Sequence, residues 1–247
     1  MTLINIELMS TVGRPRIQPR TTTGDPRDEI LEVAAGLFTT IGYAAASTRV
    51  IAEAVGLRQA SLFHYYTRKE DILADLLDLT LRPTLEIAKR LEGAQLGPAA
   101  TLWATVERDV FNLCASPHNL GAIYLLPEAK GEQFDWFWRQ RQRLFSVYRR
   151  QIRNGTEAGI FEHGADPLAA DLIFGLVESV ITGSAQARRN RRTPSVIADA
   201  SLRILGAPPQ EIEEARAVAS RFLATHKAEV PPPVRARRAA ASSAKRS

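Results

Sequence analysis

The sequence has little cysteine and histidine, which limits the chemistry available to it. Cys114 is the single cysteine among 247 residues, and the four histidines are His64, His118, His163 and His226. One cysteine excludes an intrachain disulfide and a cysteine-based metal cage. Histidines this far apart in the sequence do not suggest a helical metal site. We therefore expect neither a metal nor a cofactor.

The common motifs of nucleotide-binding and hydrolytic enzymes are also absent. The sequence has no glycine-rich phosphate loop followed by Lys-Ser/Thr and no Gly-x-Ser-x-Gly turn. Cys114 and His118 are four residues apart, a spacing that places a thiol and an imidazole on one helix face. Because Pro117 interrupts that helix, a buried structural cysteine is the simpler interpretation. We predict no catalytic residues, and an enzyme built on a helical bundle stays open as an alternative.

Long apolar runs are missing too. No run approaches the roughly 18 to 20 residues that a membrane-spanning helix needs. At the start, MTLINIELMSTVGRPR, polar Asn5 and Glu7 interrupt the apolar residues and the basic residues come afterwards, which is the wrong order for a secretory signal. We expect a soluble cytoplasmic protein whose translation starts at Met1 or at Met9.

The positive charge is concentrated at one end of the chain. The formal charge is +5, and from Lys227 onward six basic residues and one acidic residue account for all of it. Residues 1–226 are therefore formally neutral, and a nucleic-acid surface must be a local patch. We expect residues 1–24 to form a flexible basic arm and residues 227–247 a disordered basic tail.

Between these ends the apolar residues recur with helical period, and strand-like alternation does not stand out. Asp25 and Pro26 should start the first helix, which Gly42 ends. A short helix should begin at Ser47 or Thr48. Further helices are expected from Pro98 to Ala115, through NLGAIYLLPEAKG, from about Phe134 to Gly155, after Asp166-Pro167 and after Thr193-Pro194.

Gly56 separates the second helix from a third that begins within about three residues. Two short helices joined by a tight glycine turn are the ingredients of a helix-turn-helix. The stretch Thr67–Glu70 has the form of a capping box and predicts a fourth helix, which Pro83 should kink or end. The fold is thus expected to be all-α, with a small helical unit before a larger bundle.

Residues 59–66 are the candidate recognition helix. Leu62 and Tyr66 form one face, which Phe63 and Tyr65 cannot both share. At least one ring must point outward, which disfavours a plain helix pair and favours a surface with a partner. Gln59 has the chemistry to pair with adenine in a bidentate manner.

The segment ILEVAAGLFTTIGYAAASTRVIAEAVGLRQASLFHYYTRKEDIL resembles the DNA-binding domain of the TetR/AcrR family of transcriptional repressors. The likeness lies in LFTTIGY, TRVIAEAVGL and SLFHYYTRKEDIL. It implies a three-helix DNA-binding domain at residues 25–70 and a helical effector-binding and dimerisation domain at residues 71–226. Departures are Arg58 where a capping serine is usual, Ala60 where glycine is frequent, and Tyr66 where phenylalanine is common.

The resemblance and the chemistry of the side chains together predict the DNA contacts. Arg49 and Arg58 are proposed as cations near the groove, and the other positions match residues that approach DNA in the family. GRPR at residues 13–16 resembles a minor-groove arm, for which a solvated leader is the alternative. The predicted contacts are Thr48, Arg49, Arg58, Gln59, Ala60, Ser61, Phe63, His64, Tyr65 and Lys69, with Arg14 and Arg16 in the arm.

The resemblance also implies a homodimer. Helices Asp171-Ala187 and Ser195-Leu205 should pair with their copies in a second subunit, and apolar residues on several faces of the first favour a close neighbour. Two recognition helices must meet half-sites roughly 34–36 Å apart.

Aromatic residues in the second domain predict a pocket for a small apolar effector. Ordinary core packing is the alternative for each ring. The basic residues of FDWFWRQRQR are expected to form a solvated face rather than a carboxylate clamp. The candidate pocket residues are Trp103, Phe111, His118, Tyr124, Phe137, Phe145, Tyr148, Phe174 and Glu178.

We therefore predict a dimeric DNA-binding regulator, in the first instance a repressor that an effector releases from a palindromic operator. The alternative is a nonspecific architectural DNA-binding protein. That alternative predicts similar affinity for every sequence and a steep dependence on salt.

Overall fold

The computed structural model describes residues 25–116 and 118–226, and the regular structure of these residues is entirely helical. This confirms the predicted all-α class. No helix among them is both long enough and apolar enough to cross a bilayer. The α-helices are α1 (Pro26–Thr40), α2 (Thr48–Val55), α3 (Gln59–Tyr65), α4 (Lys69–Glu92), α5 (Pro98–Cys114), α6 (Asp135–Glu157), α7 (Ala169–Thr182), α8 (Ala185–Arg189), α9 (Thr193–Ile204) and α10 (Pro209–Thr225), and the 3-10 segments are η1 (Leu120–Leu125), η2 (Pro127–Lys130) and η3 (Glu132–Phe134).

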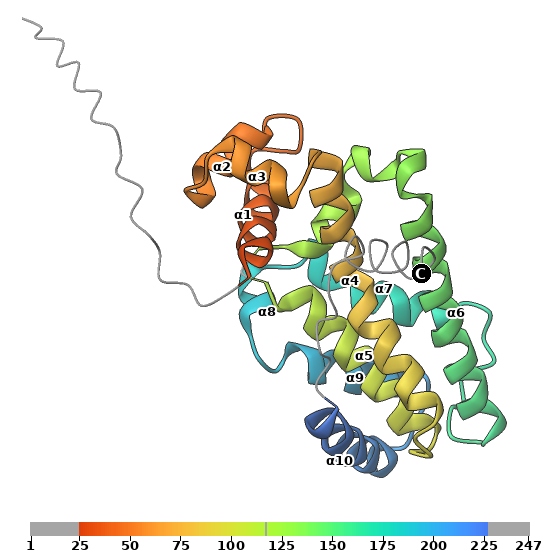
Figure 1. Ribbon diagram of the computed structural model, residues 1–247. Helices are drawn as coiled ribbons and strands as arrows, with labels where there is room; N and C mark the ends of the chain where they lie inside the picture. The colour runs from red at the N-terminus through yellow and green to blue at the C-terminus, as the bar shows by residue number, and fades with distance from the viewer. Residues whose placement is uncertain (1–24, 117, 227–247) are drawn as a thin grey trace, which may run out of the picture.

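The helices form a small unit at one end of the molecule and a larger bundle below it (Figure 1). Helices α1 to α3 lie together at the first end, and α10 lies at the opposite end. Helix α4 runs from the small unit into the bundle, where α5 contacts α4, α6, α7, α9 and α10. Helix α4 therefore contacts both α1 of the small unit and α5 and α6 of the bundle.

The small unit begins with local signals that the sequence displays. The Asp25 carboxylate accepts a hydrogen bond from the Arg27 amide at 2.9 Å, and Pro26 occupies the first turn of α1. The Ser47 hydroxyl accepts from the Val50 amide at 3.2 Å, so Ser47 is the N-cap of α2. Gly56 ends α2 with φ +82°, a left-handed conformation that glycine adopts without strain.

Helix α4 differs from the prediction at its start. Its N-cap is Arg68, whose amide donates to the Asp71 carboxylate at 3.0 Å, so the capping residues lie one position beyond Thr67–Glu70. Pro83 does not end the helix, which continues to Glu92. Pro83 is buried within the helix, which continues although a proline there removes one helical hydrogen bond.

The predicted helix through NLGAIYLLPEAKG is wrong, because this stretch forms η1 and η2 instead. Leu120 and Ile123 are buried, and a period of three keeps such residues on one side of a 3-10 turn. Pro127 then starts a new turn. The segment follows the surfaces of α4, α5 and α7 rather than standing as a helix of its own.

The helices after α6 also differ from the prediction. Helix α7 stops at Thr182 rather than continuing to Ala187, and Ser184 caps the short α8. Helix α10 was not predicted, although Pro208-Pro209 and buried Ile212 mark its start. It packs against α5 and α9.

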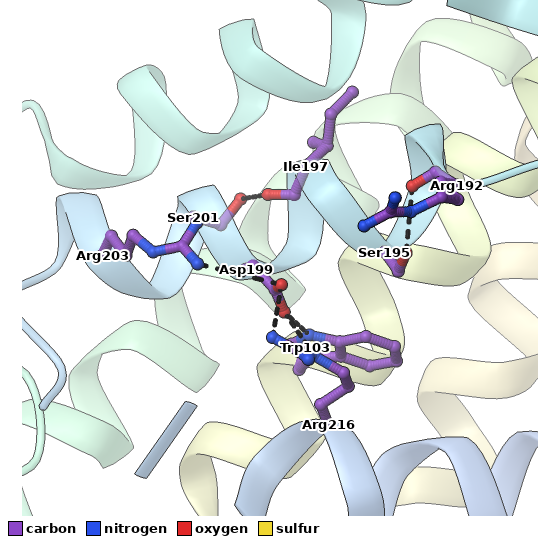
Figure 2. Close-up of polar contacts among 8 residues, drawn as sticks. All are labelled: Trp103, Arg192, Ser195, Ile197, Asp199, Ser201, Arg203 and Arg216. Atoms are coloured by element: carbon purple, nitrogen blue, oxygen red, sulfur yellow. Dashed lines mark hydrogen bonds and ion pairs between the residues drawn. The ribbon is translucent and has the colours of Figure 1, made fainter. Parts of the chain in front are cut away.

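A buried carboxylate fixes α5, α9 and α10 to one another (Figure 2). Asp199 of α9 accepts hydrogen bonds from the Trp103 indole at 2.8 Å and from Arg216 at 3.1 and 2.6 Å. Arg203, one helical turn along α9, is 4.0 Å from the same carboxylate. Asp199 therefore sets the position of α9 in the bundle.

Candidate nucleic-acid interface and bundle interior

Helix α3 is held by Leu62 on its inner face and by Tyr66, which follows the helix as its C-cap with extended backbone, one residue earlier than the predicted end. Leu62 and Tyr66 are completely buried, as the sequence predicts. The Tyr66 hydroxyl donates to the Asp75 carboxylate of α4 at 2.9 Å, and the Arg27 guanidinium lies over its ring. Burial and the nearby Asp75 charge both raise the pKa of Tyr66, so the hydroxyl stays protonated and donates.

The opposite side of α3 faces away from the protein. Phe63 is 42% exposed, and Gln59, Ala60 and His64 are exposed as well. Ser61 and Tyr65 are partly buried at the edges of this face. The prediction that at least one ring points outward is confirmed by Phe63. An exposed phenylalanine beside polar side chains is suited to contact with a partner.

A hydrogen bond between α2 and α3 orients the main candidate for base recognition. The Gln59 side-chain amide donates to the Thr48 hydroxyl at 3.0 Å. This bond uses one N–H of the amide and leaves the second N–H and the carbonyl oxygen for another partner. The first residues of both helices therefore present one joint polar surface.

The predicted cations stand around this surface in different environments. Arg49 is exposed, 3.7 Å from Glu53, and Arg58 is exposed at the N-cap of α3. The Lys69 ammonium group donates to the Tyr43 carbonyl at 2.6 Å and lies 4.0 Å from the centre of the Tyr43 ring. Lys69 is thus held in one place. Arg14 and Arg16 fall outside the described residues.

In the bundle, most of the predicted pocket residues meet between the helices. Tyr124, Phe174 and Glu178 line a cavity of only about 10 Å³ between α4, α5, α6, α7 and η1. Phe137 lies beside Tyr124, with 5.8 Å between ring centres, and Phe145 and Tyr148 meet Phe174 edge-on at 5.4 and 5.6 Å. Six of the nine candidates therefore belong to one cluster.

The other three candidates lie elsewhere. The Trp103 indole points to Asp199. Phe111 is 45% exposed on α5, under the Arg108 guanidinium. His118 packs against Gly36 of α1. These positions place Trp103 in the bundle core, Phe111 on the surface and His118 at the junction with the small unit, rather than around the cavity.

Sequence reasoning missed two charged residues of the interior. The Arg141 guanidinium pairs with Glu178, and its carbon lies 4.8, 5.6 and 5.9 Å from the ring centres of Phe174, Tyr124 and Trp138. Arg141 is therefore not part of a solvated basic face. A signal existed in the sequence, because position 141 is four residues after buried Phe137 and falls on the same helix face.

Asp109 is the second of these residues. It accepts hydrogen bonds from the Tyr148 hydroxyl at 2.9 Å and from the Thr84 hydroxyl at 3.1 Å, and it is 3% exposed. Burial raises the pKa of Asp109 to about 7, against the lowering effect of these two hydrogen bonds. The carboxyl group thus gains or loses a proton near neutral pH.

A larger, open groove of about 620 Å³ lies between α4 and α6. Its lining mixes charges of both signs, including Glu86 and Arg150, and Arg82 within it pairs with Asp78. No three histidine, cysteine or acidic side chains gather as metal ligands anywhere in the described residues. The ring-lined interior and the groove are therefore chemically different.

Comparisons with known proteins agree with the helix-turn-helix geometry. Residues 30–76 match the model of the family described as bacterial regulatory proteins, tetR family. The HTH-type transcriptional repressor KstR2 of Rhodococcus jostii (strain RHA1) is 34% identical over 144 residues, which cover 57% of this chain and 70% of that protein.

Solved structures agree in fold over more of the chain. The crystal structure of Mycobacterium smegmatis AmtR is 44% identical, covers 83% of this chain and 98% of its own, and has a TM-score of 0.72. The TetR family transcriptional regulator PfmR from Thermus thermophilus is 27% identical, covers 74% and 97%, and has a TM-score of 0.61. The chain belongs to the tetR family of bacterial regulatory proteins. It is a DNA-binding transcriptional regulator.

Proposed function

We propose that the protein is a homodimeric repressor that binds a palindromic operator through the outward face of α3. The observation that carries this proposal is the division of α3 and its C-cap into a buried side, with Leu62 and the capping Tyr66, and an exposed side that includes Gln59 and Phe63. Residues 25–70 act as the DNA-binding domain in this proposal, and residues 71–226 bind the effector and the second subunit.

The residues of the surface have different roles. Gln59, oriented by Thr48, reads a base, and adenine fits its amide best. Ala60, Ser61 and Phe63 contact base edges, including the thymine methyl group. The remaining candidates hold phosphates and fix the register of α3 in the groove: Thr48, Arg49, Arg58, His64, Tyr65 and Lys69.

Apolar side chains exposed on α7 and α9 support the homodimer. Leu168 just before α7 and Leu172 within it are more than half exposed, and the face continues past Gly175, around which there is open space. Val196 and Ile204 of α9 are exposed as well. Large apolar groups on two neighbouring helices are expected to be covered by a second copy.

Effector binding in the interior is proposed to release the operator by a population shift. The cavity of about 10 Å³ is close to the roughly 10–15 Å³ that a single water molecule needs, so an effector must move side chains to enter. The cluster touches α4 through Thr80 and Leu81, and α4 continues into the DNA-binding domain. An effector of largely apolar character fits rings such as Phe174.

Genomic footprinting followed by anisotropy titration of the recovered operator tests this function. We expect Gln59→Ala to relax base preference and Lys69→Ala to weaken binding to all sequences alike. Gln95→Ala, at an exposed glutamine in the loop after α4, is the matched control and should change neither. Equal affinity for operator and random DNA, with a steep salt dependence, would instead support the architectural alternative.

A further inference from the structure

The Arg141 side chain occupies a cage of aromatic rings and a carboxylate. Its guanidinium faces Phe174, Tyr124 and Trp138 within 6 Å, and Glu178 pairs with it at the edge. Cations bind to ring faces through the ring quadrupole, and the attraction grows when water is excluded. The chain therefore fills its own cation-binding site with one of its own side chains.

The charge of the cavity favours a cation over an anion. Among the described residues that line it, Arg141 is the single cation, while Asp109 and Glu178 are acidic. An anion would have to enter beside two carboxyl groups and compete with Glu178 for Arg141. A cation would instead take over the contacts that Arg141 already makes.

Arg141 is also the part of the cage best able to move. Its side chain is 22% exposed, so part of it already reaches solvent. Phe174 is packed edge-on against Phe145 and cannot turn aside as easily. Once outside the cage, the Arg141 guanidinium would be hydrated.

We propose that the effector is a small organic cation, an amidinium, guanidinium or substituted ammonium group on a flat apolar body, that displaces Arg141 from this cage. The inference rests on the proposed function only in treating the interior as the effector site. Asp109 also lines the cavity, and a cation beside it favours its ionised form. The cage joins α6, α7 and η1, so a change of occupant acts on all three elements.

Three probes of nearly equal shape distinguish the chemical classes: benzamidine as the cation, benzamide as the neutral form and benzoate as the anion. Binding to the full-length protein is measured by calorimetry and by tryptophan fluorescence, because the Trp138 ring forms part of the cage. We expect benzamidine to bind at least about tenfold more tightly than either analogue. Equal or tighter binding of benzoate or benzamide, or no binding of benzamidine up to about 10 mM, overturns the proposal.

Substituting the cation of the cage, Arg141, and its carboxylate, Glu178, should change the affinity for benzamidine in opposite directions. Arg141→Ala empties the cage and should strengthen benzamidine binding, whereas Glu178→Gln should weaken it about tenfold. Arg139→Ala, on an exposed site of the same helix, is the matched control and should change nothing. Weaker benzamidine binding in Arg141→Ala contradicts displacement. If that variant does not fold, Arg141→Met, which keeps most of the volume, gives the same test.

These titrations use the protein without DNA. A failure of operator binding would leave them unchanged, and a failure of benzamidine binding would leave operator recognition unchanged. The two proposals are therefore tested separately.

Discussion

His118 lies directly against Gly36, so close that a Cβ atom on residue 36 would stand 2.7 Å from the His118 Cε1 atom. The contact joins α1 of the DNA-binding unit to the segment that begins η1. Asn119 next to it donates to the Ile181 carbonyl of α7 at 2.7 Å, and Tyr124 at the other end of η1 donates to Glu178. One short segment thus touches the DNA-binding unit, α7 and the interior cage.

We predict that Gly36→Ala destabilises the protein by about 1–3 kcal/mol, because the added methyl group overpacks the α1–η1 contact. His118→Ala should remove the clash, so the double variant should recover most of the loss. Urea unfolding of the two single variants and the double variant gives the coupling energy directly. Additive effects of the two substitutions would show that the contact is not close in solution.

The pKa of Asp109 predicts a pH dependence of stability. Its pKa is raised from 3.8 to about 7, so between these values the folded state holds the proton and the unfolded state has lost it. Stability therefore falls as pH rises through this window, and the loss is complete above about pH 7. Tyr148 and Thr84 donate to the carboxyl group, and Glu178 and Arg141 act on it with opposite signs.

Asp109→Asn removes this dependence. Relative to wild type, the variant should gain stability between pH 5 and pH 8, by roughly 2.6 kcal/mol, because about two pH units of this interval lie below the raised pKa. Urea unfolding of both proteins at the two pH values measures the difference, in which other titrating groups cancel. If the free energies of unfolding of wild type and variant differ by the same amount at pH 5 and pH 8, the pKa of Asp109 is not raised.

The DNA-binding unit was predictable because its determinants are local. Asp25, Ser47 and Gly56 mark helix ends, and Leu62 in α3 and Tyr66 at its C-cap mark the inward side without reference to distant residues. The exposed side of α3 follows from the same periodicity. Its contacts with DNA stay a prediction from that pattern and from the family resemblance.

The interior was only partly predictable because it depends on which helices face each other. Trp103 and Phe111 have the same helical spacing as many core rings, yet one meets Asp199 and the other faces solvent. Arg141 seemed solvated because its neighbours in FDWFWRQRQR are mostly charged or polar. Its inward position depends on Glu178, which is 37 residues away in the sequence.

Asp199 should contribute strongly to stability, since three helices meet at its carboxylate. We expect Asp199→Ala to cost about 2–4 kcal/mol, because the Trp103 N–H is left buried without its acceptor and Arg216 loses its partner. Arg203→Ala is the control on the same helix. Its 4.0 Å contact is largely exposed, and its removal should change the unfolding midpoint little.

The proposed dimer surface can be tested by placing a charge on it. Leu172 of α7 and Leu125 of η1 are both 55% exposed, but only Leu172 lies on the proposed α7–α9 face. We expect Leu172→Arg to give a monomer in sedimentation equilibrium, because burying an unpaired guanidinium between subunits is costly. It should also weaken operator binding, since a monomer reaches a single half-site. Leu125→Arg should remain dimeric with unchanged operator affinity. If Leu125→Arg were monomeric instead, the dimer interface would include η1.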